Sequence, residues 1–387
     1  MPAPARWLGL LACIVAAQGA IAAPDRTGSD YVPGPGTAWE RRAPATAGMD
    51  ADALAAAVEF AKINETDFPR DFSTQEKIFG RPIGPVPASR AATNGIVLRH
   101  GYIVAEWGDT EAADPTYSVA KSFLSTLAGI AFEQGLIRDL DRPVKDAVSP
   151  LGDDGYDSPH NARITWAMHL NQTSEWEGAM WGKRHDFVGE KEFGQGQREP
   201  RELREPGSWW EYNDVRINRL ALSLMRMFGR PLPAVLNEFV MAPIGASDTW
   251  RYHGYVDSTA LVRGVPMVSV SGGTRWGGGL WISARDLARF GLLYARQGRW
   301  GTKQIVSPGW IKAATAAQLL GPDYGYLWWT NASGKLYPGA PRTSYAARGA
   351  GSNTVYVDPE NDLVIVWRWH REQALDAFIG KVIAAIR

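Results

Sequence analysis

The sequence predicts an α+β fold, an α/β sandwich in which an antiparallel sheet is flanked by helices. Segments rich in β-prone residues occur near both ends of the chain, at 94–109, 324–330 and 353–369. The region between them, about 140–260, shows mainly helical periodicity and loops. This order is typical of one sheet built from both chain ends, with an inserted, mostly helical domain.

Individual elements follow from local signals, taken in chain order. Asp50 is suited to cap a helix that continues to about residue 64, and residues 99–101 join two short strands as a hairpin. A helix is expected over 118–134, and Ser283 is suited to cap a later one. The turn at 359–362 joins two further strands, and an amphipathic helix over 372–387 closes the chain.

These patterns divide the chain into four parts. Residues 1–23 predict a signal peptide, and residues 24–46, rich in Pro, Gly and charge, predict an extended lead-in. The sheet domain is expected to combine 47–140 with 261–387, and the helical domain to span 141–260.

The signal peptide predicts an exported protein, periplasmic or secreted. Arg6 supplies the positive charge, residues 7–17 the apolar stretch and residues 20–22 a small-residue cleavage site. The stretch is too short for a stable membrane span. A lipid anchor at Cys13 is the alternative, but the apolar stretch continues past Cys13. Cleavage would remove this single cysteine, so the folded core of the mature protein is expected to be stabilised by packing alone, without disulfides.

Composition narrows the class of partner. The formal net charge of +0 offers no basic surplus for nucleic acid or an anionic membrane, so a small-molecule substrate is favoured. The 17 tryptophans suggest a cleft for apolar or ring-shaped groups. The 6 histidines lack metal-ligand spacing, and no dinucleotide or P-loop glycine pattern is present, so neither a metal nor a cofactor is expected. Oligomeric state is left open.

The stretch YSVAKSFLS, residues 117–125, carries the strongest catalytic signal. Ser118 begins a helix, and Lys121 follows it by three residues, so both lie on one helical face. A serine hydroxyl becomes a nucleophile when a base takes its proton, and burial among apolar residues favours a neutral, basic lysine. The alternative is a helix-capping serine followed by a solvated lysine.

Two further segments strengthen this interpretation. Tyr212 precedes a helix for which Asp214 is a natural N-cap, and a tyrosine beside a lysine can relay protons. The stretch 349–357 predicts a strand opened by glycines, where a backbone N–H could meet an oxyanion together with that of Ser118. The alternatives are an aromatic residue at a helix start, and a β-bulge.

In this order the segments resemble the serine β-lactamase and penicillin-binding-protein superfamily, nearest its class C-like branch of family VIII esterases, D-aminopeptidases and 6-aminohexanoate-dimer hydrolases. The similarity extends over about residues 94–366. It implies that Ser118 is the acylated nucleophile, Lys121 its partner base and Tyr212 the tyrosine of a Tyr-x-Asn motif. It also implies an oxyanion hole formed by the backbone N–H groups of Ser118 and Ser352.

The chain departs from the family pattern at two positions. Asp214 stands where Asn is usual, and as a charge partner it would keep Lys121 protonated, which favours Tyr212 as the base. Gly349 replaces the lysine that meets a β-lactam carboxylate, and strand alternation is expected to turn Arg348 to the other face. Further candidates for substrate contact are Gly349, Gly351, Asp214, Trp176, Trp181 and Trp210.

The resulting expectation is an exported serine hydrolase that cleaves an ester or amide through an acyl-enzyme on Ser118. D-Ala carboxypeptidase, D-aminopeptidase and β-lactamase activities are alternatives within the family. A catalytically inactive binding protein is the alternative of another class.

Overall fold

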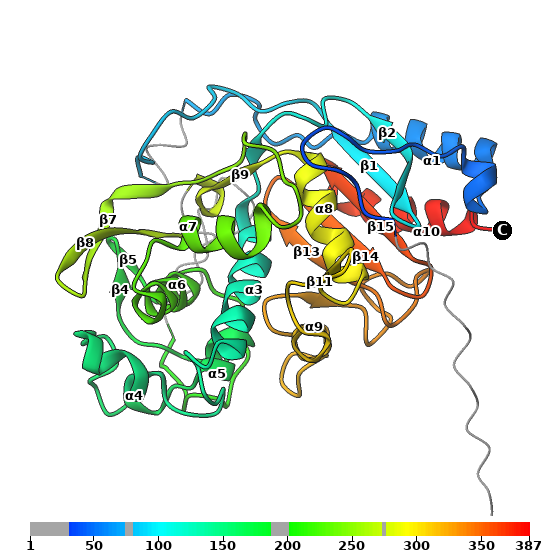
Figure 1. The fold of residues 1–387 in the computed structure, drawn as a ribbon. Helices are drawn as coiled ribbons and strands as arrows, with labels where there is room; N and C mark the ends of the chain where they lie inside the picture. Colours follow the sequence, from blue (N-terminus) through cyan, green and yellow to red (C-terminus); the bar gives the residue numbers. More distant parts are fainter. Residues whose placement is uncertain (1–30, 74–79, 187–200, 273–275) are drawn as a thin grey trace, which may run out of the picture.

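A computed structural model describes residues 31–73, 80–186, 201–272 and 276–387; the predicted signal peptide and the first residues of the lead-in lie outside this part. Its main feature is a six-stranded antiparallel sheet with strand order β12-β13-β14-β15-β1-β2. The strands are β1 (Asn94–Arg99), β2 (Tyr102–Trp107), β12 (Trp329–Thr330), β13 (Tyr345–Gly349), β14 (Asn353–Asp358) and β15 (Leu363–Arg368). Strands from the two ends of the chain pair directly, as β1 with β15, which confirms the predicted α+β class (Figure 1).

Helices cover both faces of this sheet. Helices α1 (Ala51–Ile63) and α10 (Leu375–Ala384) lie together beside one face, and α8 (Ala284–Ala295) packs on the other (Figure 1). Side chains alternate accordingly, because Ala346 belongs to the buried cluster with α1 and α10, while Ala347 belongs to the cluster with α8.

The expected helix caps at Asp50 and Ser283 and the two expected hairpin turns are confirmed. The Asp50 carboxylate accepts a hydrogen bond from Ala53 N at 2.9 Å, and the Ser283 hydroxyl accepts one from Asp286 N at 3.1 Å. The β1–β2 turn contains His100 and Gly101, with φ of 54° and 83°. The β14–β15 turn falls at 359–362, as expected.

The remaining elements lie largely in the middle of the chain. The helices are α3 (Ala120–Glu133), α4 (Val144–Val148), α5 (Trp166–Leu170), α6 (Val215–Phe228), α7 (Leu232–Leu236) and α9 (Pro308–Ala314). Short helical turns are η1 (Pro44–Ala47), η2 (Tyr117–Val119), η3 (Ser149–Leu151), η4 (Asn161–Arg163), η6 (Asn237–Met241), η7 (Trp276–Gly279) and η8 (Glu372–Ala374). Minor strands are β3 (Asp114–Pro115), β4 (Ala179–Met180), β5 (Lys183–Arg184), β6 (Arg251–Tyr252), β7 (Gly254–Val262), β8 (Val265–Val270), β9 (Leu280–Ile282), β10 (Arg299–Trp300) and β11 (Lys303–Gln304).

Two expectations about strands need correction. The β7–β8 hairpin was not anticipated, although it begins inside the segment expected to be helical. The glycine-opened strand expected over 349–357 is two strands, because β13 ends at Gly349 and β14 begins at Asn353. Ser352 lies in the intervening turn with φ of 56° and Gly351 with φ of 70°, conformations that do not continue an extended strand. The domain limits remain a prediction.

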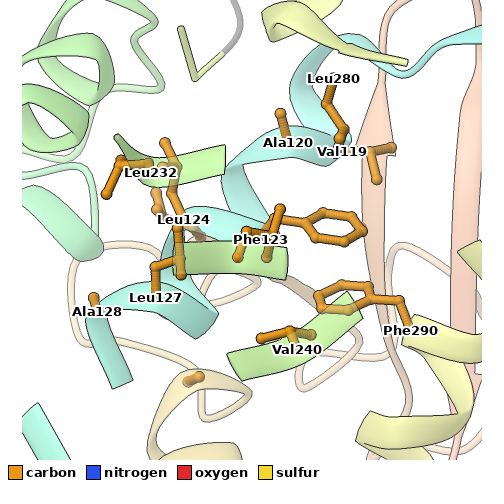
Figure 2. Close-up of a cluster of buried hydrophobic side chains, with 14 of the residues drawn as sticks. Val119, Ala120, Phe123, Leu124, Leu127, Ala128, Leu232, Val240, Leu280 and Phe290 are labelled. Carbon is orange, nitrogen blue, oxygen red and sulfur yellow. The ribbon is translucent and has the colours of Figure 1, made fainter. Parts of the chain in front are cut away.

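Helix α3 is the central element of the core. Its residues from Ala120 to Ala131 are buried, and the Phe123 ring stacks on Phe290 of α8 with centroids 3.8 Å apart. Figure 2 shows the two rings facing each other, and Leu124, Leu127 and Leu232 belong to the same buried cluster. This packing anchors the start of α3, where Ser118 and Lys121 lie.

Within the described ranges, no helix combines the length and apolar character needed to cross a membrane.

Candidate active site

Ser118 lies in the short turn η2, immediately before α3. The preceding residue, Tyr117, has φ of 52°, in the left-handed region that is uncommon for a non-glycine residue. Its buried ring packs edge-on against Phe68 and Trp369, with centroids 5.5 and 6.3 Å away. These contacts hold the strained turn in place, and Ser118 itself is only partly buried. Its hydroxyl is thus fixed but reachable.

Lys121 joins Ser118 to Asp214. The Lys121 ammonium donates a hydrogen bond to Ser118 Oγ at 2.9 Å and a second to Asp214 Oδ1. Lys121 is 1% exposed and Asp214 4%, so the ion pair is buried. A buried ion pair needs such close geometry to offset the loss of hydration. The expected charge pairing of Asp214 with Lys121 is therefore present in the structure.

Asp214 does not cap α6 with its side chain, contrary to expectation. The residue occupies the N-cap position without a capping hydrogen bond. Instead, the Asn213 side chain accepts a hydrogen bond from Arg216 N at 2.8 Å. Because the Asp214 carboxylate is directed to Lys121, the neighbouring amide takes over the capping role.

Tyr212 is placed beside the same two residues. The Lys121 ammonium lies 4.7 Å from the centre of the Tyr212 ring, and the Ser118 side chain is near enough to the Tyr212 phenol to lower its pKa. Burial, followed by the charge of Asp214, raises the pKa of Tyr212 well above its usual value. The Ser118 side chain and the charge of Arg348 oppose this rise only in part. Tyr212 is therefore a neutral phenol at neutral pH.

An aromatic cluster that the sequence did not assign surrounds Tyr212. Its ring stacks on Trp329 at 5.5 Å and meets Tyr324 edge-on at 6.1 Å. Trp210, a predicted substrate-contact residue, packs edge-on against both Tyr324 and Trp329. The only signal for Trp329 and Tyr324 was their membership of an aromatic, strand-like stretch at 324–330. The four rings form an apolar wall beside the catalytic candidates.

Gly349 lies directly against the Ser118 turn. A Cβ atom at Gly349 would overlap the carbonyl oxygen of Thr116 and would lie 3.0 Å from Ser118 N. Only glycine therefore permits the end of β13 to approach this turn so closely. The next backbone N–H along the chain is that of Ala350. The close approach places a strand end beside the Ser118 N–H, the arrangement an oxyanion hole requires.

Ser352 and Gly351 lie farther along, in the β13–β14 turn. The Ser352 hydroxyl donates to Glu372 at 3.1 Å, and its carbonyl accepts from His370 N at 3.3 Å. A Cβ atom at Gly351 would lie 2.5 Å from the Trp369 ring. Gly351 is thus required by its left-handed backbone conformation and by its close contact with the Trp369 ring. Ser352 connects the turn to η8 through its hydrogen bond with Glu372.

Arg348 is nearer to the catalytic candidates than strand alternation predicted. Its backbone does alternate with that of Gly349, but the guanidinium lies 5.6 Å from the centre of the Trp329 ring. Its charge lowers the pKa of Tyr212. The partner strand β12 has only 2 residues, so the long side chain can extend around this sheet edge. Arg348 also forms an ion pair with Glu372.

The other two predicted substrate-contact tryptophans differ in position. Trp176 is 3% exposed, and its indole N–H donates to the Gly155 carbonyl at 2.8 Å, so it is a core residue. Trp181 packs against Tyr255 at 6.2 Å. Tyr255 belongs to the aromatic cluster that also contains Tyr117, and Trp181 is partly buried against the main core. Among the described residues, no group of three acidic, histidine or cysteine side chains is arranged to hold a metal ion.

Comparisons with known proteins agree with this architecture. The family model Beta-lactamase matches residues 96–384. A penicillin-binding protein homolog from Caulobacter crescentus is similar with 16% identity and a TM-score of 0.59, over 88% of this chain and 99% of that chain. A β-lactamase (Mb2281c) from Mycobacterium bovis is similar with 22% identity and a TM-score of 0.51, over 78% and 94%.

A third solved structure is EstCE1, a hydrolase with promiscuous acyltransferase activity, at 17% identity and a TM-score of 0.55, over 87% of this chain and 98% of that chain. No curated protein matches the chain significantly. At these identities the solved structures share the fold, while the family match covers most of the chain. The chain therefore belongs to the beta-lactamase family, within the superfamily of serine β-lactamases and penicillin-binding proteins.

Proposed function

We propose that this chain is an exported serine hydrolase that cleaves an ester or amide bond through a covalent acyl-enzyme on Ser118. The observation that carries the proposal is the 2.9 Å hydrogen bond from the Lys121 ammonium to Ser118 Oγ. Ser118 lies in the turn that leads into α3, and Lys121 is buried in the first turn of α3, so the pair is fixed before any substrate binds. A nucleophile with a positioned proton-transfer partner is the basis of this type of catalysis.

In the proposed acylation step, Tyr212 acts as a neutral proton relay. Ser118 Oγ attacks the carbonyl carbon and passes its proton to Tyr212 Oη, while Tyr212 passes its own proton to the leaving oxygen or nitrogen. The bond to the leaving group then breaks, and an acyl-Ser118 ester remains. This relay needs no phenolate beforehand, which agrees with the raised pKa of Tyr212.

Lys121 and Asp214 have electrostatic roles in this scheme. The ammonium stabilises negative charge that develops on Ser118 Oγ during attack, and Asp214 forms the buried ion pair that holds the ammonium in place. The carbonyl oxygen becomes an oxyanion that accepts hydrogen bonds from the backbone N–H of Ser118 and from a second backbone N–H. Because Gly349 abuts Ser118, we assign the second donor to Ala350 in preference to Ser352. Water then enters, and the reverse proton path releases the acid.

The side chains around the proposed catalytic residues favour neutral, apolar substrates. Tyr212, Trp210, Tyr324 and Trp329 supply an aromatic wall, Asp214 balances the charge of Lys121, and Glu372 balances that of Arg348. We expect hydrolysis of short-chain p-nitrophenyl esters to exceed that of nitrocefin, whose carboxylate would need an unpaired cation. A higher kcat/KM for nitrocefin than for p-nitrophenyl butyrate would instead favour β-lactamase activity.

A fluorophosphonate probe tests the nucleophile directly. We expect intact-mass analysis to show one adduct on the purified protein, and Ser118→Ala to lose both the adduct and ester turnover. Ser122→Ala is the matched control, because Ser122 lies four residues later, in α3, but donates to the Leu327 carbonyl at 2.8 Å. An adduct that persists in Ser118→Ala would refute the assignment. Export is tested separately by sequencing the N-terminus of the mature protein, expected near residue 24.

A further inference from the structure

The segment that carries Tyr212 has no secondary structure to hold it. Helix α6 begins only at Val215, so the backbone around Tyr212 depends on contacts with other segments. One residue contacts both sides of it. Glu211 N donates to the backbone carbonyl of Gln172 at 3.0 Å, and Asn213 N donates to the side-chain oxygen of Gln172, also at 3.0 Å.

We propose that Gln172 is a positioning residue for Tyr212, which it keeps within hydrogen-bond reach of Ser118. The inference rests on the proposed function, because it concerns the proton relay from Ser118. Gln172 itself does not take part in the relay. It acts by fixing the two peptide groups that flank Tyr212, and therefore the direction of the phenol.

The conformation of Gln172 suits this role. The residue is 2% exposed and has φ of 64°, which allows its backbone and side-chain carbonyls to serve the same neighbouring segment. A left-handed conformation is unfavourable for a residue with a Cβ atom, so surrounding contacts must maintain it. The side-chain amide also donates to the Tyr324 hydroxyl at 3.5 Å, and Tyr324 in turn packs edge-on against Tyr212.

A buried charge network joins the Gln172 loop to the Tyr212 segment. Arg216 donates to Glu175 at 2.8 Å and to Glu211 at 3.3 Å. Glu175 follows Gln172 by three residues, and Glu211 precedes Tyr212 directly. All three ionic side chains are buried, so their geometry is tightly constrained. The two segments are therefore joined both by this network and by the Gln172 carbonyls, which bond the residues on either side of Tyr212.

The test uses Gln172→Met, which keeps the length of the side chain but removes its acceptor and donor. We expect the rate of fluorophosphonate labelling and kcat for p-nitrophenyl butyrate to fall about 10-fold, because small displacements of catalytic groups reduce rates strongly. KM should change little. In a Tyr212→Phe background, Gln172→Met should cause no further loss of labelling rate or kcat, because Gln172 acts only by positioning the Tyr212 hydroxyl.

Two more variants separate positioning from general destabilisation. Asn161→Leu is the control, because Asn161 holds the same loop through Glu177 N at 2.9 Å and Gly155 O at 3.1 Å. It should lower the thermal midpoint while leaving the labelling rate unchanged. Gln172→Glu keeps an oxygen that can accept the Asn213 N–H, so this variant should be labelled by the fluorophosphonate faster than Gln172→Met. It replaces Gln172→Met in the test if that variant does not fold.

The outcomes are distinguishable. A wild-type rate in Gln172→Met, or an equal loss in the Tyr212→Phe background, would overturn the positioning role while Ser118-dependent labelling still supports the proposed function. Absence of Ser118-dependent labelling in the unmodified protein would overturn both.

Discussion

The buried ammonium of Lys121 is bonded to the carboxylate of Asp214, and the same ammonium reaches the Ser118 hydroxyl. This arrangement balances a charge that burial would otherwise make costly. It also means that neither member of the ion pair can be removed without leaving its partner uncompensated.

A double-mutant cycle on this pair measures its coupling. Asp214→Asn and Lys121→Met are each expected to lower the free energy of unfolding by about 3–5 kcal/mol, because each leaves a buried charge unpaired. The double variant should lose much less than the sum, as measured by urea unfolding. Glu59→Gln is the control, since it breaks an exposed pair with Lys62 and should cost under about 1 kcal/mol. Additive losses would show that the pair is not coupled.

The fit of Gly349 against the Ser118 turn leads to a second prediction. In Gly349→Ala the added methyl group would overlap the Thr116 carbonyl oxygen, so β13 must move away from Ser118. We expect kcat for p-nitrophenyl butyrate to fall by about 10²-fold or more, the usual effect of losing an oxyanion donor. Gly380→Ala in α10 is the matched control, because a Cβ atom there meets nothing within 4 Å. Unchanged kcat in Gly349→Ala would exclude this strand end from the oxyanion hole.

The ion pair between Arg348 and Glu372 is expected to limit the use of anionic substrates. Glu372→Gln leaves the guanidinium unpaired beside Trp329, where it can meet a substrate carboxylate. We expect kcat/KM for nitrocefin to rise a few-fold, about 5-fold at most, since the pair is partly exposed. Turnover of neutral p-nitrophenyl butyrate should stay the same. Arg348→Gln should not show the nitrocefin gain; an equal gain in both variants would point to a general loosening of the sheet edge.

The parts of the site that the sequence predicted are those with local signals. Ser118 and Lys121 lie three residues apart at a helix start, so helical geometry alone brings them together. Asp214 could be predicted as a partner of Lys121 only through the family resemblance, because the two residues lie on separate elements. The paired strands near both chain ends were likewise visible as β-prone runs with turns between them.

The parts that escaped prediction depend on tertiary contacts. The approach of the Arg348 guanidinium to the Trp329 ring has no local signal, because Trp329 lies on the separate strand β12. Trp329 stacks on Tyr212, and Gln172 bonds the two residues that flank Tyr212, through long-range contacts that leave no periodic pattern in the sequence. The β7–β8 hairpin was missed because its segment was interpreted with the helical region before it.

Acid should destabilise the protein through two buried histidines. Burial lowers the pKa of His370 to about 3, and burial together with the charges of Arg219 and Arg216 lowers that of His169 to about 3. Both are neutral when folded, but on unfolding they regain a pKa of about 6.5. Their contribution to stability is therefore fully present above about pH 6.5 and is lost as the pH falls toward 3.

His370→Gln isolates one of these contributions. The His370 ring is hydrogen-bonded to the Thr354 hydroxyl at 2.9 Å and to the Arg371 carbonyl at 3.0 Å, and an amide can meet both partners. The comparison covers the range from about pH 6 to about pH 4, where the histidine takes up a proton only in the unfolded state. Over this range, the free energy of unfolding should fall with decreasing pH more steeply for the unmodified protein than for the variant. The difference in slope should be about 1.4 kcal/mol per pH unit. Urea unfolding at several pH values measures both slopes, and His169→Gln should flatten the profile in the same way. Parallel profiles would mean that His370 is already protonated in the folded protein, with its charge accommodated beside Trp367, against which the ring stacks at 4.5 Å.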